Sequence, residues 1–429
     1  MARLLFAACL LLALGASPSA RAGMMARDCS DPFVFRGAAV NALVLPWRVE
    51  SGSPRLLATG RQLSSLALLQ LLMGMLPLGS IGAVDLVASP GATCDVDEVL
   101  GRVSRGGALG GTLAPGQAVV VLWGRFFEQD GELFVQTYLR FARQGATTGS
   151  GLQPETLSLG WGGETLQAAL PMQALAFAPR RLRVDELARI DAASRAALRV
   201  RPQPDAAAPG VALPSAPGEG LPYWITAQRG DWLQLQPMRP GLPAGWVRAR
   251  SGDDSVPEWS LSRWLPELDY ALGVAGWLRL QVGSVGDAER ARIAQFTDAA
   301  LARYEAAVPG DEAPAAWGLA AALRGQLAWA RGDRAAAAAL FAQARARLPA
   351  SAAAANLAAV SALSDTPADA ASAQRLGRAL LGALAMAPQD AQLRANLAAL
   401  YRLYADKPGL SPFEPAELAQ RQQVLSGVR

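Results

Sequence analysis

The second half of the chain has an alanine-rich helical pattern, and this pattern constrains the fold more than any other feature. From about 258 to 405, helix-forming residues alternate with short polar turns. The clearest unit is Ala321 to Pro349, in which Gly332 and Asp333 supply a turn between two helices and the proline ends the second helix. Small residues at Gly325 and Ala337 would let the two helices approach closely. We therefore expect a stack of paired helices.

This unit resembles the tetratricopeptide (TPR) repeat. The residues at the offsets of its signature are Gly325, Ala337, Phe341, Ala344 and Pro349, whereas Ala321, Arg324 and Ala328 depart from it. A further unit restarts at Asn396–Tyr401, and 287–309 has the pattern of a degenerate earlier unit. The resemblance implies an all-α TPR-like repeat domain over 258–429, with about three stacked units. A plain alanine-rich helical bundle is the alternative.

Repeats of this kind bind protein partners along a concave face that is lined by the first helix of each pair. In the clearest unit, Phe341 and Ala337 would pack between helices. Arg324 and Gln326 are polar residues of the first helix, and they are the candidates for partner binding.

The amino terminus has the three parts of a secretory signal peptide. Arg3 gives a positive start, Leu4 to Leu14 is an apolar run too short to span a bilayer, and Ala20 to Ala22 provides small residues before Gly23. We predict a signal peptide over 1–22, cleaved after Ala22, and a periplasmic or secreted protein. A lipoprotein anchored through Cys9 is the less favoured alternative.

After cleavage the chain would keep Cys29 and Cys94. In an oxidising compartment two thiols favour a disulfide, and closing a loop of this length stabilises a protein by roughly 4 kcal/mol. Two unpaired buried thiols are the alternative.

Residues 23–200 predict an α/β sandwich. The strongest local signal is a β-hairpin, with strands at 117–127 and 132–142 around the turn Asp130–Gly131. Other expected strands are 41–47, 83–88, 156–159 and 165–170, and the expected helices are 61–75, 95–103 and 184–200. The charge-free interval between Arg61 and Asp85 could be a membrane span, but Pro77 and Gly79 interrupt it, so we predict a buried helix and no stable span.

Within this region the strand Leu43–Pro46, the leucine-rich helix and the strand Val120–Arg125 before the hairpin resemble a known envelope domain. It is the periplasmic α/β domain of the TolB amino-terminal and curli-assembly CsgG type. The resemblance covers about 100 residues. It implies a non-enzymatic domain that binds partner proteins in the cell envelope.

Residues 201–220 are rich in Pro, Ala and Gly and predict a linker. The following segment, 221–257, resembles a bacterial SH3-like barrel because Gly230–Trp232 and Gly245–Val247 recur in the order of that fold. Trp232 and Trp246 are either core residues, which we favour, or the lining of a ligand groove.

The composition excludes several catalytic chemistries. The chain has no histidine, and Lys407 is its only lysine, so it has neither a Ser-His-Asp triad nor a Walker A loop. An enzyme using carboxylates alone is the remaining catalytic alternative, with Glu128, Asp130 and Glu132 at the hairpin turn. A polar hairpin tip explains these residues better. We predict no catalytic residues, no metal site and no cofactor.

The sequence thus predicts a multidomain α+β protein that acts as a non-catalytic envelope adaptor. It would bind protein partners through the TPR-like repeats and the α/β domain. The alternative is a protein that binds peptidoglycan through the SH3-like segment. Nucleic acid is not an expected partner, since the formal net charge is only +4 and the basic residues are not clustered.

Overall fold

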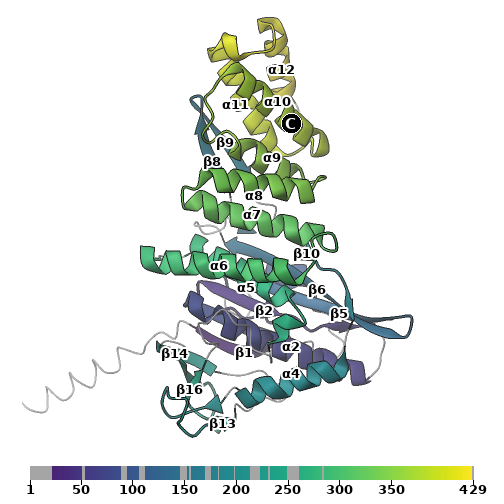
Figure 1. The fold of residues 1–429 in the computed structure, drawn as a ribbon, viewed down its shortest axis with the longest axis vertical. Coiled ribbons are helices and arrows are strands. Elements are labelled where there is room, and N and C mark those ends of the chain that lie inside the picture. Colours follow the sequence, from purple (N-terminus) through teal and green to yellow (C-terminus); the bar gives the residue numbers. More distant parts are fainter. Residues whose placement is uncertain are drawn as a thin grey trace, which may run out of the picture.

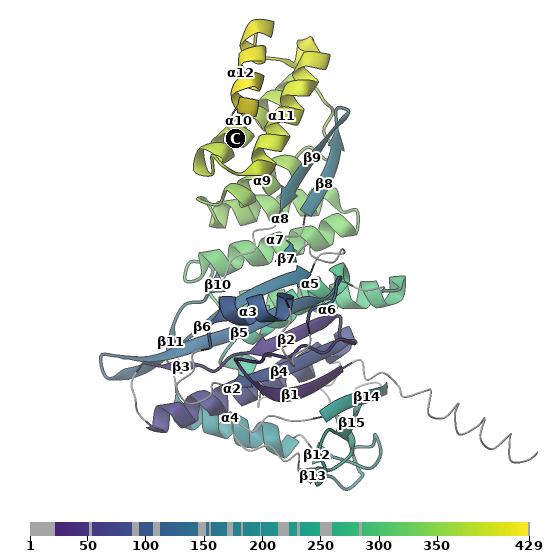
Figure 2. The same ribbon diagram turned by 180° about the vertical axis from the view of Figure 1, so that it is seen from behind.

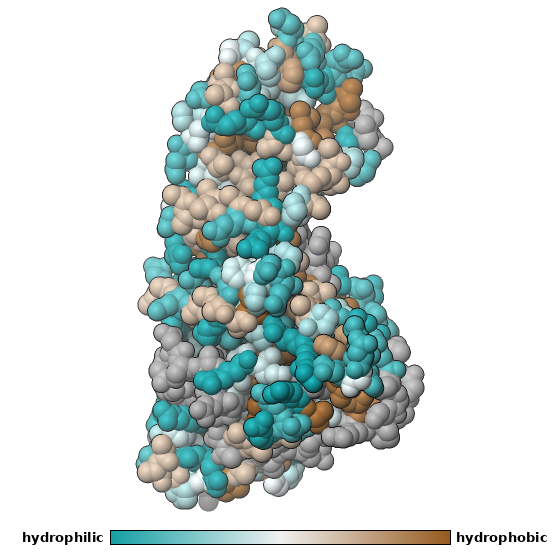
Figure 3. Space-filling view, turned by 45° about the vertical axis from the view of Figure 1, so that its right-hand side comes forward, coloured by the Kyte–Doolittle hydropathy of each residue, from teal (hydrophilic) through white to brown (hydrophobic). Residues whose placement is uncertain are grey.

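The protein is elongated, with a sheet-rich end and a helical end (Figure 1). The computed structural model describes residues 22–50, 54–87, 94–105, 112–144, 152–153, 156–169, 175–181, 183–197, 199–212, 223–229, 232–248, 260–282 and 285–427. Apart from Ala22, the predicted signal peptide lies outside these residues. On the face shown in Figure 3, apolar residues form small separate patches among polar ones.

A mixed sheet of twelve strands forms the base of the molecule, in the order β10-β6-β5-β2-β4-β1-β14-β15-β16. The strands β3 on β5, and β7 and β11 on β6, lie off this path. Strands β1, β4, β2 and β5 are parallel, and the pairs β5–β6 and β1–β14 are antiparallel. The bounds are β1 Ala22–Asp28, β2 Val40–Val44, β3 Arg48–Val49, β4 Ile81–Val87, β5 Ala118–Gln129, β6 Glu132–Gln144, β7 Leu152–Gln153, β10 Leu175–Ala176, β11 Arg180–Arg181, β14 Tyr223–Arg229, β15 Trp232–Pro237 and β16 Gly245–Arg248.

The long hairpin β5–β6 confirms the strongest local prediction. Its loop is Asp130–Gly131, and both residues have positive φ, 54° and 76°. Positive φ at both loop residues defines the type I′ turn that matches the twist of the flanking strands. Figure 2 shows the hairpin running past the rest of the sheet.

Helices cover both faces of the sheet, so the region is an α/β sandwich. Helices α2 (Pro54–Met75) and α5 (Glu267–Gln281) lie on one face, and α4 (Val184–Ala197) packs against α2. Helix α3 (Val96–Arg105) covers the other face with Val99, Leu100 and Val103. Asp95 caps α3, because its Oδ1 accepts hydrogen bonds from the N–H groups of Asp97 and Glu98 at 2.9 and 3.1 Å.

Helix α2 is apolar because it is a core helix. Its segment Leu56–Met75 is long and apolar enough to cross a membrane by length and composition, yet 72% of the window is buried inside the protein. Leu272 of α5 lies so close that a Cβ added at Gly74 would come within 2.7 Å of its side chain. The close α2–α5 contact accounts for the hydrophobicity of this segment.

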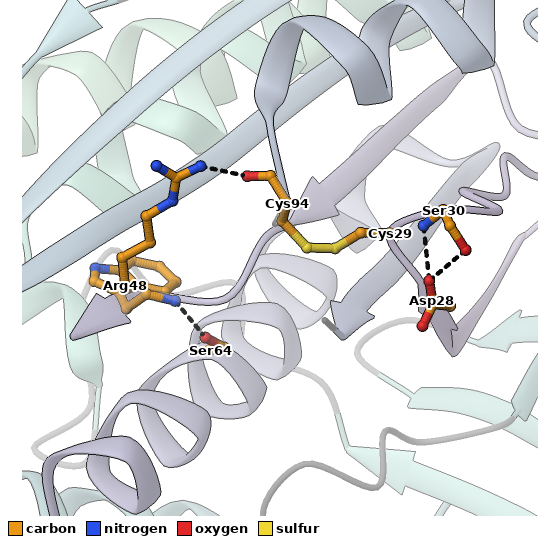
Figure 4. The surroundings of a disulfide bond; sticks show 7 residues. Asp28, Cys29, Ser30, Arg48, Ser64 and Cys94 are labelled. Carbon is orange, nitrogen blue, oxygen red and sulfur yellow. Dashed lines mark hydrogen bonds between the residues drawn. A yellow bond between two sulfur atoms is a disulfide. The ribbon is translucent and has the colours of Figure 1, made fainter. Parts of the chain in front are cut away.

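The disulfide between Cys29 and Cys94 ties the end of β1 to the residue before the α3 cap (Figure 4). The two Cα atoms are 5.4 Å apart, and the cysteines are separated by 65 residues in sequence. Beside the bridge, the Arg48 side chain donates a hydrogen bond to the carbonyl of Cys94 at 3.1 Å. The predicted cysteine pairing is therefore confirmed at the level of geometry.

The helical end is a run of consecutive helices compatible with a repeat array. The bounds are α6 Asp287–Ala307, α7 Pro314–Ala330, α8 Arg334–Arg347, α9 Ala352–Ser361, α10 Ala370–Met386, α11 Ala391–Asp406 and α12 Pro415–Gly427. In the pair α7–α8, Phe341 is fully buried, and a Cβ added at Gly325 would lie 2.7 Å from its ring. Phe341 and Ala337 are thus buried between the helices, as predicted, and Phe341 lies against Gly325.

Helix α5 differs from its expected place. It falls within the predicted repeat domain, 258–429, yet every residue from Glu267 to Arg279 is buried and the helix lies on the sheet. One continuous apolar core consequently runs from Val40 in the sheet to Leu418 in α12. The α/β region and the helical end share this core.

The segment between the sheet and the helices also departs from expectation. The described part of the predicted linker folds back, because β12 (Arg199–Val200) pairs with β13 (Val211–Ala212) and Arg201 pairs with Trp246. Strands β14, β15 and β16 form a meander that extends the main sheet through β1. The described strands therefore do not confirm an SH3-like barrel. Residues 221–222, 230–231 and 249–257 lie outside the described residues.

Candidate functional site

A second hairpin, β8 (Thr156–Trp161) and β9 (Glu164–Ala169), leaves the sheet region and lies against the helical end (Figures 1 and 2). Both strands overlap the predicted ones, 156–159 and 165–170, to within two residues at each described end. They form a separate two-stranded sheet that packs on α9 and α11. The surface of α9 and α11 that receives the hairpin is called the groove below.

Alternation along the hairpin explains how it sits in the groove. One face is apolar and buried, and it consists of Leu157, Trp161, Leu166 and Ala168. The residues of β8 that point the other way, Thr156, Ser158 and Gly160, are exposed. The two-residue turn is Gly162–Gly163, with φ of 67° and 105°, where glycine is the residue that adopts such angles without strain. A Cβ at Gly162 would also lie 2.8 Å from Leu403 of α11.

The groove holds the main chain of β9 through two asparagines. Asn396 on α11 accepts a hydrogen bond from the Gln167 N–H at 2.8 Å and donates one to the Gln167 carbonyl at 2.5 Å. Asn356 on α9 donates to the same carbonyl at 3.1 Å and accepts a hydrogen bond from Asn396 at 2.9 Å. Both side chains are 2% exposed, so these contacts are shielded from water.

Further polar contacts continue along the hairpin. The Gln392 side chain accepts a hydrogen bond from the Ala169 N–H at 2.7 Å. Near the turn, the Trp161 indole donates to the Thr366 carbonyl at 2.9 Å, and Lys407 donates to the Gly162 carbonyl at 3.0 Å. Arg402 of α11 also forms an ion pair with Glu164 of β9 at 2.7 Å, so two hairpin side chains make polar contacts. The other polar contacts are to main-chain atoms of the hairpin, and they hold an extended backbone.

The outer edge of β8 is open. Gln167 and Ala169 direct their N–H groups to the helices, away from β8, and the register places Ser158 opposite Gln167 and Thr156 opposite Ala169. In an antiparallel pair, two directly opposed residues either bond to each other through their main chains or direct their N–H and C=O groups to the two outer edges. Ser158 and Thr156 are of the second kind, so their main-chain groups face outward from β8. In the part of the chain that the structure describes, no strand pairs with this edge of β8.

Exposed edge strands are usually protected by charged residues, proline or a bulge. Residues 156–161 contain no charged residue and no proline, and their register with β9 has no shift. An unprotected edge of this kind accepts an added strand from another chain.

The predicted partner-binding residues Arg324 and Gln326 on α7 do not lie in the groove. Arg324 forms ion pairs with Asp298 and Glu305 of α6 at 2.8 and 2.7 Å, and Gln326 is only 7% exposed. Their expected exposure was wrong, because α6 packs beside α7 and its carboxylates engage the arginine. A role in partner binding stays a prediction for both residues.

Trp232 and Trp246 are each engaged by an arginine. Trp246 is 7% exposed, with the Arg229 guanidinium carbon 5.3 Å from its ring centroid. Trp232 is half-buried, and the Arg201 guanidinium carbon lies 5.7 Å from the centroid of its ring. The favoured interpretation of Trp246 as a core residue agrees with this burial.

A buried polar cluster joins the sheet to the helical end. The Arg180 Nε donates to Glu267 at 2.8 Å, and the Glu267 side chain is 2% exposed. Burial raises the pKa of Glu267 above its usual range, and the positive charge of Arg180 opposes that shift. The rings of Tyr270 and Tyr304 meet edge to face beside it, 5.0 Å between centroids. This cluster fastens β11 to α5 and α6.

Other candidate chemistry is absent or occupied. No three His, Cys, Asp or Glu side chains in the described residues are grouped to hold a metal ion. At the β5–β6 turn, Glu128 and Asp130 are exposed, and Glu132 forms an ion pair with Arg181 at 2.7 Å. These three residues occupy a solvated hairpin tip.

The sequence contained a signal for the asparagine pair that motif-based reasoning missed. The same five letters, ANLAA, occur at 355–359 on α9 and at 395–399 on α11, and they place Asn356 and Asn396 40 residues apart. A polar residue repeated in an apolar stretch indicates a polar ligand held by both helices.

Comparison of the chain with protein-family models, curated proteins and solved structures finds no match.

Proposed function

We propose that the protein is a non-catalytic scaffold of an oxidising, extracytoplasmic compartment that binds protein partners through its helical end. The observation that carries this proposal is the backbone recognition in the groove. Asn356, Asn396 and Gln392 hold main-chain groups of an extended segment, and such contacts accept many sequences. The TPR-like pattern supports the same function, and so does the disulfide, which persists in oxidising compartments.

The hairpin already fills the groove over α9 and α11, so a partner reaches this site through the hairpin. We propose that an extended segment of the partner pairs with the open edge of β8, around Ser158, as an added strand. Main-chain hydrogen bonds would supply the affinity, and the exposed side chains of Thr156 and Ser158 would contact alternate residues of the partner.

The test is a variant that blocks only this edge. In Ser158→Pro the lost N–H is the outward one, so the ladder between β8 and β9 is kept. Ser158→Ala, which keeps the N–H, is the matched control. Tagged mature proteins would be used for affinity capture from an envelope extract, with bound proteins quantified by mass spectrometry.

We expect proteins captured by the wild type and by Ser158→Ala to be lost with Ser158→Pro. The folded state of each variant would be checked by circular dichroism and thermal unfolding. Equal capture by all three folded proteins would contradict strand addition at β8. The absence of any partner enriched over a tag-only control would contradict the scaffold function.

A further inference from the structure

A small pocket lies at the far end of the helical region, away from the hairpin. It has a volume of about 220 Å³ and opens between α10, α11 and the segment before α12. Its floor is formed by Gly377, Tyr401, Tyr404 and Phe413, and Leu381 and Arg378 stand at its rim. The hairpin contacts other residues of α11, among them Asn396, so the pocket is a separate site.

The floor of the pocket is apolar and preformed. The three rings of Tyr401, Tyr404 and Phe413 have centroids 6.1 to 6.3 Å apart, and the tyrosines are 3% and 1% exposed. The Tyr404 hydroxyl donates to the Ala373 carbonyl at 2.9 Å, so its hydrogen-bonding need is met inside the protein. The floor therefore offers ring surfaces to an apolar group.

Gly377 leaves the space open. A Cβ added there would stand 3.4 Å from both Leu400 and the Tyr404 hydroxyl, which is ordinary contact. A methyl group therefore fits, whereas a larger side chain at this position would occupy the pocket itself.

The rim combines apolar surface with positive charge. Leu381 is 38% exposed, and Arg378 is exposed one turn away on the same helix. Within the described residues, the Arg378 guanidinium has no hydrogen-bond or ion-pair partner. Arg421 adds a second cation, 4.2 Å from the Phe413 ring centroid, although Glu417 pairs with it at 2.8 Å. Positive charge at the rim disfavours a cationic ligand and favours a carboxylate.

We propose that this pocket binds the carboxyl terminus of a partner protein whose last residue is apolar. The last side chain would fill the aromatic floor, and Arg378 would bind the terminal carboxylate. The pocket is smaller than the roughly 300–1,000 Å³ of typical small-molecule sites, which suits a single side chain.

The test uses a five-residue glycine–serine peptide that ends in phenylalanine with a free carboxylate and carries fluorescein at its amino end. Fluorescence polarisation would measure its binding to the full mature protein. We expect saturable binding with a Kd below about 1 mM, and binding weakened about 10-fold when the terminal carboxylate is an amide. A peptide ending in glycine should bind at least about 10-fold more weakly, because it leaves the floor empty.

Two variants test the assignment of residues. Gly377→Leu should abolish binding by filling the pocket, and Arg378→Gln should weaken the acid peptide about 10-fold while leaving the amide unchanged. Arg345→Gln, at an exposed position of α8 outside the pocket, is the matched control for Arg378→Gln and should fold and bind as the wild type does. Arg378→Gln changes an exposed side chain, so the proposal remains testable even if Gly377→Leu fails to fold.

Three results would overturn the proposal. These are no saturable binding of the acid peptide, equal binding of acid and amide, or unchanged binding by Arg378→Gln. Free 3-phenylpropionate serves as a competitor. If it displaced the peptide at concentrations equal to those of unlabelled peptide, a small carboxylic acid and not a peptide terminus would be the ligand. None of these outcomes depends on the edge of β8, so failure here leaves the proposed scaffold function standing.

Discussion

Replacing Asn396 by alanine should release the β8–β9 hairpin from the groove. The side chain makes hydrogen bonds to the Gln167 N–H, to the Gln167 carbonyl and to Asn356, and it is 2% exposed. Each net hydrogen bond contributes about 0.5–1.5 kcal/mol, and a buried partner left unpaired costs about 1–3 kcal/mol. We therefore expect the free energy of local opening of the hairpin to fall by about 2–4 kcal/mol.

Hydrogen–deuterium exchange measured by mass spectrometry suits this prediction, because it reports opening of one segment in a large protein. A loss of 2–4 kcal/mol corresponds to exchange about 30 to 1,000 times faster in peptides covering 164–169. Gln392→Ala removes a single hydrogen bond and should give an effect of about 1 kcal/mol. Gln420→Ala, at an exposed position of α12, is the control and should change nothing in the hairpin.

The refuting result is specific. If exchange over 164–169 is the same in Asn396→Ala and in the wild type, the apolar face of the hairpin alone holds it in place. The groove would then be a packing surface, and its description as a backbone-binding site would be wrong.

Cys94→Ser opens the disulfide and should lower the free energy of unfolding by roughly 4 kcal/mol; unreduced wild-type protein should show no free thiol on titration under denaturing conditions. Phe341→Ala creates a cavity beside Gly325 and should destabilise the helical end by about 3–5 kcal/mol, seen as a lower unfolding midpoint of α7–α8 peptides in exchange experiments. Arg324→Glu places a third carboxylate beside Asp298 and Glu305 of α6, and we expect a clear fall in the thermal midpoint. The raised pKa of Glu267 means that the folded state favours its protonated form, so this residue stabilises the fold below its ordinary pKa of 4.5 and loses that contribution as pH rises through the folded-state pKa. Glu267→Gln should remove this pH-dependent part of the stability, measured as the difference in unfolding midpoint between wild type and variant from pH 4 to about 8.

Local sequence signals were sufficient wherever neighbouring residues decide the structure. Asp130–Gly131 predicts the β5–β6 turn because residues with positive φ are needed there, and the structure has them. The helix expected at 95–103 is present as α3, and the small residues Gly325 and Ala337, expected to let two helices approach, lie where α7 and α8 pack closely. The pairing of Cys29 with Cys94 followed from having two cysteines after the predicted cleavage site.

The missed assignments concern contacts between distant segments. Helix α5 was assigned to the repeats because an apolar helix has the same pattern whether it packs on a sheet or on another helix. Arg324 was expected to be exposed because its ion-pair partners, Asp298 and Glu305, lie on a neighbouring helix whose placement the sequence does not specify.

For the hairpin and its groove, too, the sequence predicts the local features but not the contacts between distant segments. The sequence by itself determined that 156–169 forms two strands and that Asn356 and Asn396 occur in identical stretches. Only the tertiary structure decided that these strands lie in the groove, with one backbone residue held by both asparagines. The physical reason is that strand alternation and the helical period fix which residues share a face of an element. Which other element that face packs against depends on the burial gained over the whole folded chain.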